Sequence, residues 1–187
     1  WKLTEKNAQE KSTDLLEIIN EASNNDFKIS IAKGSIVDTP GTEAIANAAN
    51  DSMTGGKAID GVILKFADTG DGKNGEEGYH EGPIVKASQE YMRLKGLKSI
   101  PEGKAFAVDA GPHFEKIGVK YVIQVNGTTK NNDQKEYDAF YNALTAAAEK
   151  KATSIAVPGI STGIFGYSKE KAAKLFIKAA LSFAKDN

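Results

Sequence analysis

Two glycine-rich stretches in this 187-residue chain carry residue types that suit the binding of an anion. Residues 157–167 read VPGISTGIFGY, and residues 55–61 read GGKAIDG. Glycine lets backbone N–H groups approach a phosphate closely, and the start of a helix adds positive potential. Because each stretch precedes a helical pattern, the two could hold one diphosphate from both sides. For residues 157–167 an ordinary tight connection between a strand and a helix is an equally good interpretation, since glycine-rich turns are common.

Three polar residues accompany the glycine-rich stretch at 55–61. Asn47 and Asn50 end an apolar run, and Asp60 lies in the first turn of the helical pattern that follows. Asparagine disfavours strands and offers both donors and an acceptor, which suits the recognition of hydroxyl groups. The alternative for the pair is a turn organised by asparagine. Asp60 could act as a base, or its charge could simply stabilise the start of the helix.

The periodicity of apolar residues predicts the elements that position these groups. Strands are predicted at 26–33, 43–46, 105–108, 120–126 and 153–157. Helices are predicted over 7–24, from about 58 to 66, from Pro83 to Gly96, after 131–133, and after Ser168. Strands and helices alternate, so we expect an α/β fold, a three-layer α/β/α sandwich with a mixed, largely parallel central sheet. Ligands bind beyond the carboxyl ends of such strands, so one cleft could contain both glycine-rich stretches.

Composition excludes several classes of function. Lys and Arg number 24 against 25 Asp and Glu, which gives a net charge of -1 and no basic field for nucleic acid or an anionic membrane. The absence of cysteine excludes disulfides, thiolate nucleophiles and zinc sites that use cysteine. No apolar run approaches the ~20 residues that span a bilayer. We therefore expect a soluble, cytoplasmic monomer that binds neither nucleic acid nor membrane.

The length fits a single domain over residues 1–187. We expect a helical extension over about residues 1–25, and we interpret the glycine-rich, acidic residues 68–82 as a mobile insertion at the rim of the cleft, without core content. The acidic residues of this insertion do not match the spacing of an EF-hand. His80, within the insertion, and His113, in a predicted turn, are assigned no role.

Three motifs taken together resemble the signature of the macrodomain family. They are AIANAAN at 44–50, GGKAIDG at 55–61 and PGISTGIFGY at 158–167, and their order and spacing match over about residues 27–184. Macrodomains bind ADP-ribose, and many hydrolyse ADP-ribose from modified proteins or from O-acetyl-ADP-ribose. The sequence AIDG at 58–61 is most similar to the Gly-Val-Asp-Gly motif of the MacroD-like ADP-ribosyl hydrolases.

This resemblance implies roles for individual residues. Asp60 would position or deprotonate a water molecule that attacks the anomeric carbon of the distal ribose, and Asn50 would bind hydroxyls of that ribose. Contacts with the ligand are implied for Ser35, Ile36, Asn47, Gly55, Gly56, Ala58, Ile59, Ser161, Thr162, Gly163, Ile164, Phe165 and Gly166. Among these, Phe165 would pack against the distal ribose. The scheme requires no metal and no cofactor.

The chain departs from the family pattern in three places. Ser35 stands where the family has an aspartate that binds the adenine amino group, so Ser35 or Asp38 would have to replace it. Lys57 places a side chain among the glycines of the first loop, where it could clash with phosphate or add a cation. Many relatives end in a further strand, so we expect either a sheet that lacks this edge or a trimmed chain.

The leading hypothesis is a macrodomain that hydrolyses ADP-ribose from the acidic side chains of mono-ADP-ribosylated protein, or that hydrolyses O-acetyl-ADP-ribose. One alternative is a module that binds ADP-ribose without turning it over. Another is an enzyme or binder for a different phosphorylated nucleotide, because Ser35 changes the expected contact with the base.

Overall fold

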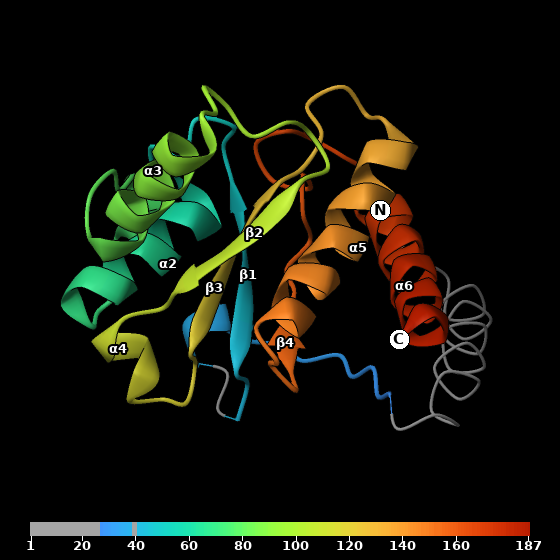
Figure 1. Ribbon diagram of the computed structural model, residues 1–187, viewed down its shortest axis with the longest axis horizontal. Helices are drawn as coiled ribbons and strands as arrows, with labels where there is room; N and C mark the ends of the chain where they lie inside the picture. Colours follow the sequence, from blue (N-terminus) through green and yellow to red (C-terminus); the bar gives the residue numbers. More distant parts are fainter. Residues whose placement is uncertain (1–26, 39–40) are drawn as a thin grey trace, which may run out of the picture.

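A four-stranded sheet forms the centre of the structure, a computed structural model that describes residues 27–38 and 41–187 (Figure 1). Its strands are β1 (Ala44–Ala49), β2 (Ala105–Asp109), β3 (Tyr121–Asn126) and β4 (Ile155–Ala156). Their order across the sheet is β2-β3-β1-β4. Strand β1 pairs in parallel with β3 and β4, whereas β2 is antiparallel to β3. The mixed, largely parallel sheet expected from the sequence is therefore confirmed.

Helices cover both faces of the sheet and complete the three layers. The helical segments are η1 (Ile36–Asp38), α2 (Ala58–Thr69), η2 (Gly75–Glu77), α3 (Pro83–Lys95), α4 (Pro112–Glu115), α5 (Asp133–Glu149) and α6 (Lys169–Asp186). Helices α2 and α3 lie on one side of the sheet, and α5 and α6 pack together on the other (Figure 1). Among the helices of residues 27–38 and 41–187, none is both long and apolar enough to cross a lipid bilayer.

The alternation of side chains along the strands produces two separate cores. Ile45 and Val122 contribute to the core under α2 and α3, whereas their neighbours Ala46 and Ile123 belong to the core under α5 and α6. Successive side chains of a strand point to opposite faces, so a fully covered sheet needs apolar residues at both parities. The same alternation directs Asn47 to the face covered by α2, which becomes important for the site.

Capping residues fix the starts of α5 and α6. The Asn132 side chain accepts a hydrogen bond of 3.0 Å from Lys135 N at the start of α5. The Ser168 hydroxyl accepts one of 3.4 Å from Lys171 N at the start of α6. Both residues satisfy N–H groups that have no partner within the helix. These predicted helix starts are confirmed, as are Pro83 and Gly96 at the two ends of α3.

Two predicted strands differ from the structure. Residues 27–33, the described part of the strand expected at 26–33, have no regular secondary structure. Phe27 and Ile29 are partly buried, but Ile31 is 81% exposed, so the alternation does not continue. A strand exists only where a neighbour completes its hydrogen bonds. Strand β4 is likewise shorter than the predicted 153–157, and the helix expected over 7–24 lies outside the described residues.

The insertion at 68–82 packs onto α2, contrary to the expectation that it has no core content. Gly75 is buried, and a Cβ added to Gly61 of α2 would lie only 1.9 Å from the Gly75 carbonyl oxygen. Tyr79 N donates a hydrogen bond of 2.8 Å to Gly56 O, and the Tyr79 hydroxyl donates to the Asp68 carboxylate. These contacts place the insertion beside the glycine-rich stretch at 55–61.

Candidate functional site

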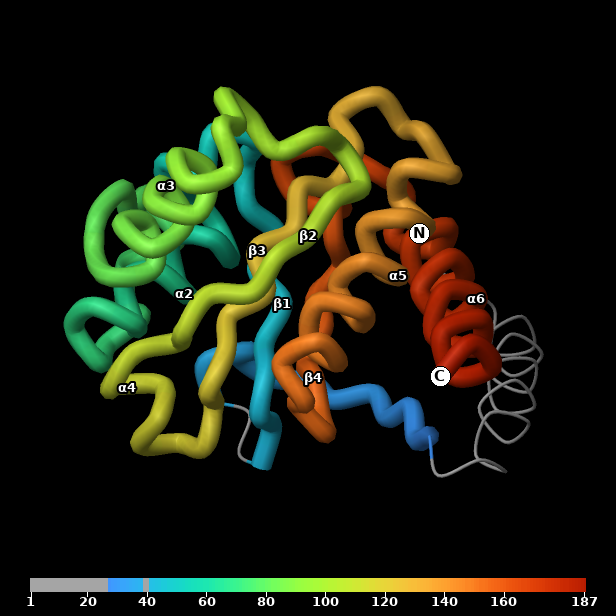
Figure 2. The backbone as a smooth tube through the Cα atoms, viewed as in Figure 1, coloured from blue at the N-terminus to red at the C-terminus, as the bar shows by residue number. Residues whose placement is uncertain are grey.

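The two glycine-rich stretches lie at the same end of the sheet (Figure 2). Together they line a hollow of about 180 Å³. One wall follows β1 and begins α2, and the other lies between β4 and α6. We call this space the central hollow. Its lining residues are Ala48, Ala49, Asn50, Gly56, Lys57, Ala58, Ile59, Asp60, Gly127, Gly159, Ser161, Gly163, Ile164 and Phe165. The carboxyl ends of parallel strands form the usual ligand-binding edge of an α/β sheet, as expected from the sequence.

Asp60 is a nearly buried acid on the wall of the central hollow. Its exposure is 5%, and its Oδ1 accepts a hydrogen bond of 2.7 Å from Asn47 Nδ2. Burial raises the pKa of Asp60 from 3.8 to about 6, while the hydrogen bond from Asn47 and the charge of His80 act in the opposite direction. The group is thus largely ionised at neutral pH, yet binds a proton more readily than an exposed aspartate. These properties suit a general base.

Asn47 supports Asp60 from within the sheet, and its predicted contact with a ligand stays a prediction. It is fully buried and absent from the lining of the hollow. Its Nδ2 also donates to Gln124 Oε1 at 2.8 Å, and Gln124 Nε2 donates to Ser88 Oγ at 2.9 Å. This chain of side chains connects β1, β3 and α3. These hydrogen bonds hold the Asn47 amide, which in turn orients Asp60. The sequence analysis did not identify Gln124 or Ser88 as part of the site.

Asn50 lines the hollow, but its amide is used to form the turn from residue 50 to residue 55. Asn50 Nδ2 donates to Gly55 O at 2.6 Å, and Asn50 Oδ1 accepts from Ser52 Oγ at 3.1 Å and from Thr54 N at 3.2 Å. The structure therefore shows the turn organised by asparagine that the sequence left as an alternative. A contact between Asn50 and a ribose hydroxyl stays a prediction.

The second wall, which we call the 159–166 loop, is held at two points by α5. Ser161 Oγ donates a hydrogen bond of 2.6 Å to Glu136 Oε2 and accepts one of 2.8 Å from Thr128 N. At the far end, the Tyr167 hydroxyl donates to Asp133 Oδ1 at 2.6 Å. Between these anchors the side chain of Ile164 is 74% exposed. The loop thus has a fixed base and an apolar tip that is free to cover a ligand.

Six described residues other than glycine have a positive φ, and two of them line the hollow. Met53, Ala58 and Ser161 have φ angles of 53°, 54° and 59°, in the left-handed region that residues other than glycine avoid. Two of the three, Ala58 and Ser161, line the hollow itself. Such conformations cost of order 1–3 kcal/mol each and concentrate at functional sites, where surrounding contacts enforce them.

Several predicted contact residues lie outside the central hollow. Ser35 is exposed and Ile36 is partly buried in η1, a segment that contacts α2. Gly55 is buried beneath the backbone of Tyr79 and His80. Thr162 and Gly166 belong to the 159–166 loop without lining the hollow. Conversely, Ala48, Ala49, Gly127 and Gly159 line it without having been predicted as contacts. Gly127 could have been found, because it directly follows a strand predicted to be parallel to its neighbour.

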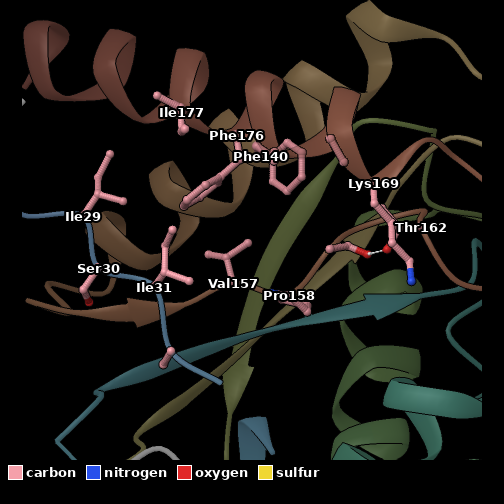
Figure 3. Close-up of a pocket in the computed structure, with 14 residues that line it drawn as sticks. Ile29, Ser30, Ile31, Phe140, Val157, Pro158, Thr162, Lys169, Phe176 and Ile177 are labelled. Atoms are coloured by element: carbon pink, nitrogen blue, oxygen red, sulfur yellow. Dashed lines mark hydrogen bonds between the residues drawn. The ribbon is translucent and has the colours of Figure 1, made fainter. Parts of the chain in front are cut away.

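Thr162 faces a second and larger hollow, of about 490 Å³, on the other side of the loop (Figure 3). There Ile29 and Ile31 lie opposite Phe176 and Ile177 of α6, and the Thr162 hydroxyl donates to Gly159 O at 2.8 Å. Among the described residues that line this space, Lys169 is the only one with an ionisable side chain. This wall is mainly apolar, whereas the lining of the smaller central hollow includes the carboxyl group of Asp60.

Comparison with known proteins gives a consistent result. The model of the Macro domain family matches residues 79–176. The chain is 32% identical over 158 residues to the O-acetyl-ADP-ribose deacetylase of Escherichia coli K12, a similarity that covers 83% of this chain and 80% of that protein. It is 33% identical over 174 residues to an uncharacterized protein of Thermotoga maritima, but spans only 26% of that longer protein.

The fold also matches solved structures. An Oceanobacillus iheyensis macrodomain mutant with ADPR superposes with a TM-score of 0.66 and 28% sequence identity, over 82% of this chain and 76% of that chain. Three observations indicate the same family: the helix–sheet architecture, the two glycine-rich walls and the family match over about half of the sequence. The chain belongs to the Macro domain family.

Proposed function

We propose that this macrodomain binds ADP-ribose in the central hollow and hydrolyses the ester between its distal ribose and an acyl group. The observation that carries this proposal is Asp60, a 5% exposed carboxyl group whose pKa is raised to about 6, on the wall between two glycine-rich loops. The similarity to O-acetyl-ADP-ribose deacetylase supports the ester as substrate class. Mono-ADP-ribosylated acidic side chains contain the same kind of ester.

The two walls suit the sugar and diphosphate end of this ligand. The hollow of about 180 Å³ is smaller than the ~300–1,000 Å³ of pockets that enclose drug-sized ligands. It therefore accommodates the distal ribose with the diphosphate, and the adenosine lies outside it. Backbone N–H groups of the 159–166 loop and of the first turn of α2 would face the phosphates. Phe165 lines the hollow and would cover the ribose.

Asp60 would act on a water molecule held between its carboxylate and the anomeric carbon. Asn47 occupies Oδ1, whereas Oδ2 faces Gly56, at a position where a Cβ on that glycine would lie 2.8 Å away. As the water oxygen attacks the anomeric carbon, its proton passes to Asp60 Oδ2. Where the acyl group is attached at the anomeric carbon, as on an ADP-ribosylated acidic side chain, the bond from that carbon to the acyl oxygen breaks, and the acyl group leaves as a carboxylate with the electron pair. Asp60 then returns the proton to solvent.

The non-catalytic alternative is favoured by one observation, the side chain of Lys57 at the wall of the hollow. A cation at this wall would strengthen binding of the ground state, and binding alone does not accelerate the reaction. A chain that binds ADP-ribose without turnover would act as a reader of ADP-ribosylation. Recognition of another nucleotide stays open at Ser35, which is exposed and lies outside the hollow.

An assay of ADP-ribose release tests the proposal directly. The substrates are a protein mono-ADP-ribosylated on acidic side chains and O-acetyl-ADP-ribose, each with the unmodified chain and with Asp60→Ala. We expect the unmodified chain to release ADP-ribose from at least one substrate and the Asp60→Ala variant to release it from neither. Calorimetric titration with ADP-ribose, ADP, AMP and GDP-ribose accompanies it. Binding without release would favour the reader, and tighter binding of GDP-ribose would favour another nucleotide.

Lys57→Ala is expected to weaken ADP-ribose binding by about three- to tenfold, because it removes a cation beside the diphosphate; this corresponds to ~0.7–1.4 kcal/mol. The loss should shrink as salt rises, since exposed charges are screened. Calorimetry at low and high ionic strength measures both effects. Lys86→Ala, an exposed lysine on α3, is the matched control. Tighter binding by Lys57→Ala would instead show that the side chain obstructs the phosphates.

A further inference from the structure

A fully buried carboxyl group lies behind the 159–166 loop and has no part in the chemistry assigned to Asp60. Glu136 of α5 is 0% exposed, and its Oε1 has no hydrogen-bond partner within the described residues. Its other oxygen, Oε2, accepts the hydrogen bond of 2.6 Å from Ser161 Oγ. Burial of a carboxyl group with an unpartnered oxygen lowers stability. An apolar residue at this position would avoid that cost, but it could not accept the hydrogen bond from Ser161.

Ser161 connects Glu136 to the ligand space. It lines the central hollow, and its hydroxyl also accepts a hydrogen bond of 2.8 Å from Thr128 N. The backbone at Ser161 has a strained φ of 59° that these contacts maintain. A Cβ on Gly127 would lie 2.0 Å from Ser161 Oγ, so this hydroxyl is packed tightly against the end of β3. Ser161 thus links the Glu136 carboxyl to the wall of the hollow.

We propose that Glu136 is a positioning residue for the diphosphate, which holds the Ser161 turn in place and takes up a proton when the phosphates bind against that turn. The proposal rests on the proposed binding of ADP-ribose in the central hollow. Glu136 does not touch the ligand and acts only through Ser161.

Binding of ADP-ribose should favour protonation of Glu136, because the phosphates and the buried carboxylate carry like charges. Burial raises the pKa of Glu136 from 4.5 to about 7, and the hydrogen bond from Ser161 only partly opposes it. A diphosphate near Ser161 adds negative charge and raises this pKa further. Above about pH 7 the free protein has an ionised Glu136, whereas the complex favours the protonated form. Affinity should therefore fall as pH rises, by up to about tenfold per pH unit.

The surrounding charges do not compensate Glu136. The ionisable groups packed around this part of α5 are Asp133 on the same helix, Tyr167 and Lys171 at the start of α6, and Glu102 and Lys130 near the end of β3. Lys171 lies 3.4 Å from Asp133, and Lys130 is near Glu102, so both cations have other carboxylates as neighbours. Tyr167 donates its hydroxyl hydrogen to Asp133. Proton uptake is thus the available way to remove the charge of Glu136.

Calorimetric titration of ADP-ribose into the full chain tests the proposal. Affinity is measured from about pH 7 to about pH 9, in buffers of different ionisation enthalpy that report the protons taken up. We expect the unmodified chain to lose affinity with rising pH and to take up a proton. Glu136→Gln keeps a hydrogen-bonding partner for Ser161 but cannot titrate, so it should bind with little dependence on pH. Glu149→Gln, an exposed acid at the end of α5, should behave like the unmodified chain.

Two further variants separate this role from others. Glu136→Leu removes the partner of Ser161, so it should remain folded but bind ADP-ribose more weakly than Glu136→Gln. Asp60→Asn should retain the pH dependence, and Asp60→Asn combined with Glu136→Gln should lose it. Binding by the unmodified chain without a pH dependence, or with one that Glu136→Gln shares, would overturn the coupling but leave ADP-ribose binding intact. Absence of binding would overturn the proposed function and the coupling together.

Discussion

Asp60→Asn is expected to lower the rate of ADP-ribose release by about 10²–10⁴-fold, the usual contribution of a positioned general base. Asparagine keeps an acceptor for Asn47 Nδ2, whose bond to Asp60 Oδ1 is 2.7 Å long, so the wall of the hollow should keep its shape. ADP-ribose affinity should stay within about tenfold, ~1.4 kcal/mol. Release kinetics and calorimetry on the same preparation measure the two effects.

The same substitution should make the protein more stable. The pKa of Asp60 is about 6 in the folded chain against 3.8 in the unfolded one, so the folded state binds the proton more tightly. Its contribution to stability falls as pH rises from about 4 to about 6, and above that range the ionised carboxyl costs about 3 kcal/mol. Asparagine carries no charge at any pH. Thermal unfolding should therefore show a higher Tm for Asp60→Asn at neutral pH, with little difference near pH 4.

The pH profile of release gives a third measurement on Asp60. The base must be ionised, so kcat/KM, which reports the free protein, should rise with pH up to about 6. Asp109→Asn is the matched control, because Asp109 is an exposed aspartate that pairs with Tyr121 at the opposite end of β3 from the hollow. Equal release by Asp60→Asn and the unmodified chain would remove Asp60 from the mechanism. Loss of both release and binding would make it a binding residue.

The periodicity of the sequence predicted most of the architecture, for reasons visible in the structure. The strand around Val122 and Ile123 is apolar at both parities because helices cover both faces of the sheet. Pro83 and Gly96 bound α3 by their own backbone preferences, which need no tertiary context. Residues 27–33 lacked such a local determinant. Their pattern is that of a strand, but a strand also requires a neighbour, and neighbours are not encoded locally.

The site was predicted in its location and only partly in its roles. Glycine spacing identified both walls, because close backbone approach is a local property. The roles of Asn47 and Asn50 depended on which groups they would meet in the fold. Strand parity places Asn47 with Ile45, on the face covered by α2, so its orientation toward Asp60 could have been predicted. The partnership of Glu136 and Ser161 joins residues 25 apart in sequence and has no local signal.

The two walls of the hollow differ in how they are supported, and this difference assigns them different roles. Asp60 accepts a hydrogen bond from Asn47 within the sheet, and the insertion packs against α2, so this wall is supported from two sides. The 159–166 loop is fixed at Ser161 and Tyr167 but exposes Ile164 between them. A supported wall and a wall with an exposed tip suit the proposed binding, in which a ligand would enter before the tip covers it.

Gly61→Ala is expected to destabilise the fold by about 3 kcal/mol, because the added methyl group has no space between two backbones. A Cβ at Gly61 would lie 1.9 Å from Gly75 O and 2.8 Å from Gly56 O, and neither carbonyl belongs to a side chain that could turn away. Alanine favours helix over glycine by ~1 kcal/mol, which offsets only part of the loss. For a chain of this size, Tm should fall by about 10 °C.

The substitution should also reduce ADP-ribose release, since Gly56 lines the hollow and the insertion is joined to it by the bond from Tyr79 N to Gly56 O. Gly163→Ala is the matched control for stability, because no atom lies within 4 Å of the position of its Cβ and its φ is not in the left-handed region. Its Tm should stay within about 2 °C of the unmodified chain. If Gly61→Ala unfolded at the same temperature as Gly163→Ala, the insertion would not be seated on α2, and the support assigned to Asp60 would have to come from Asn47 alone.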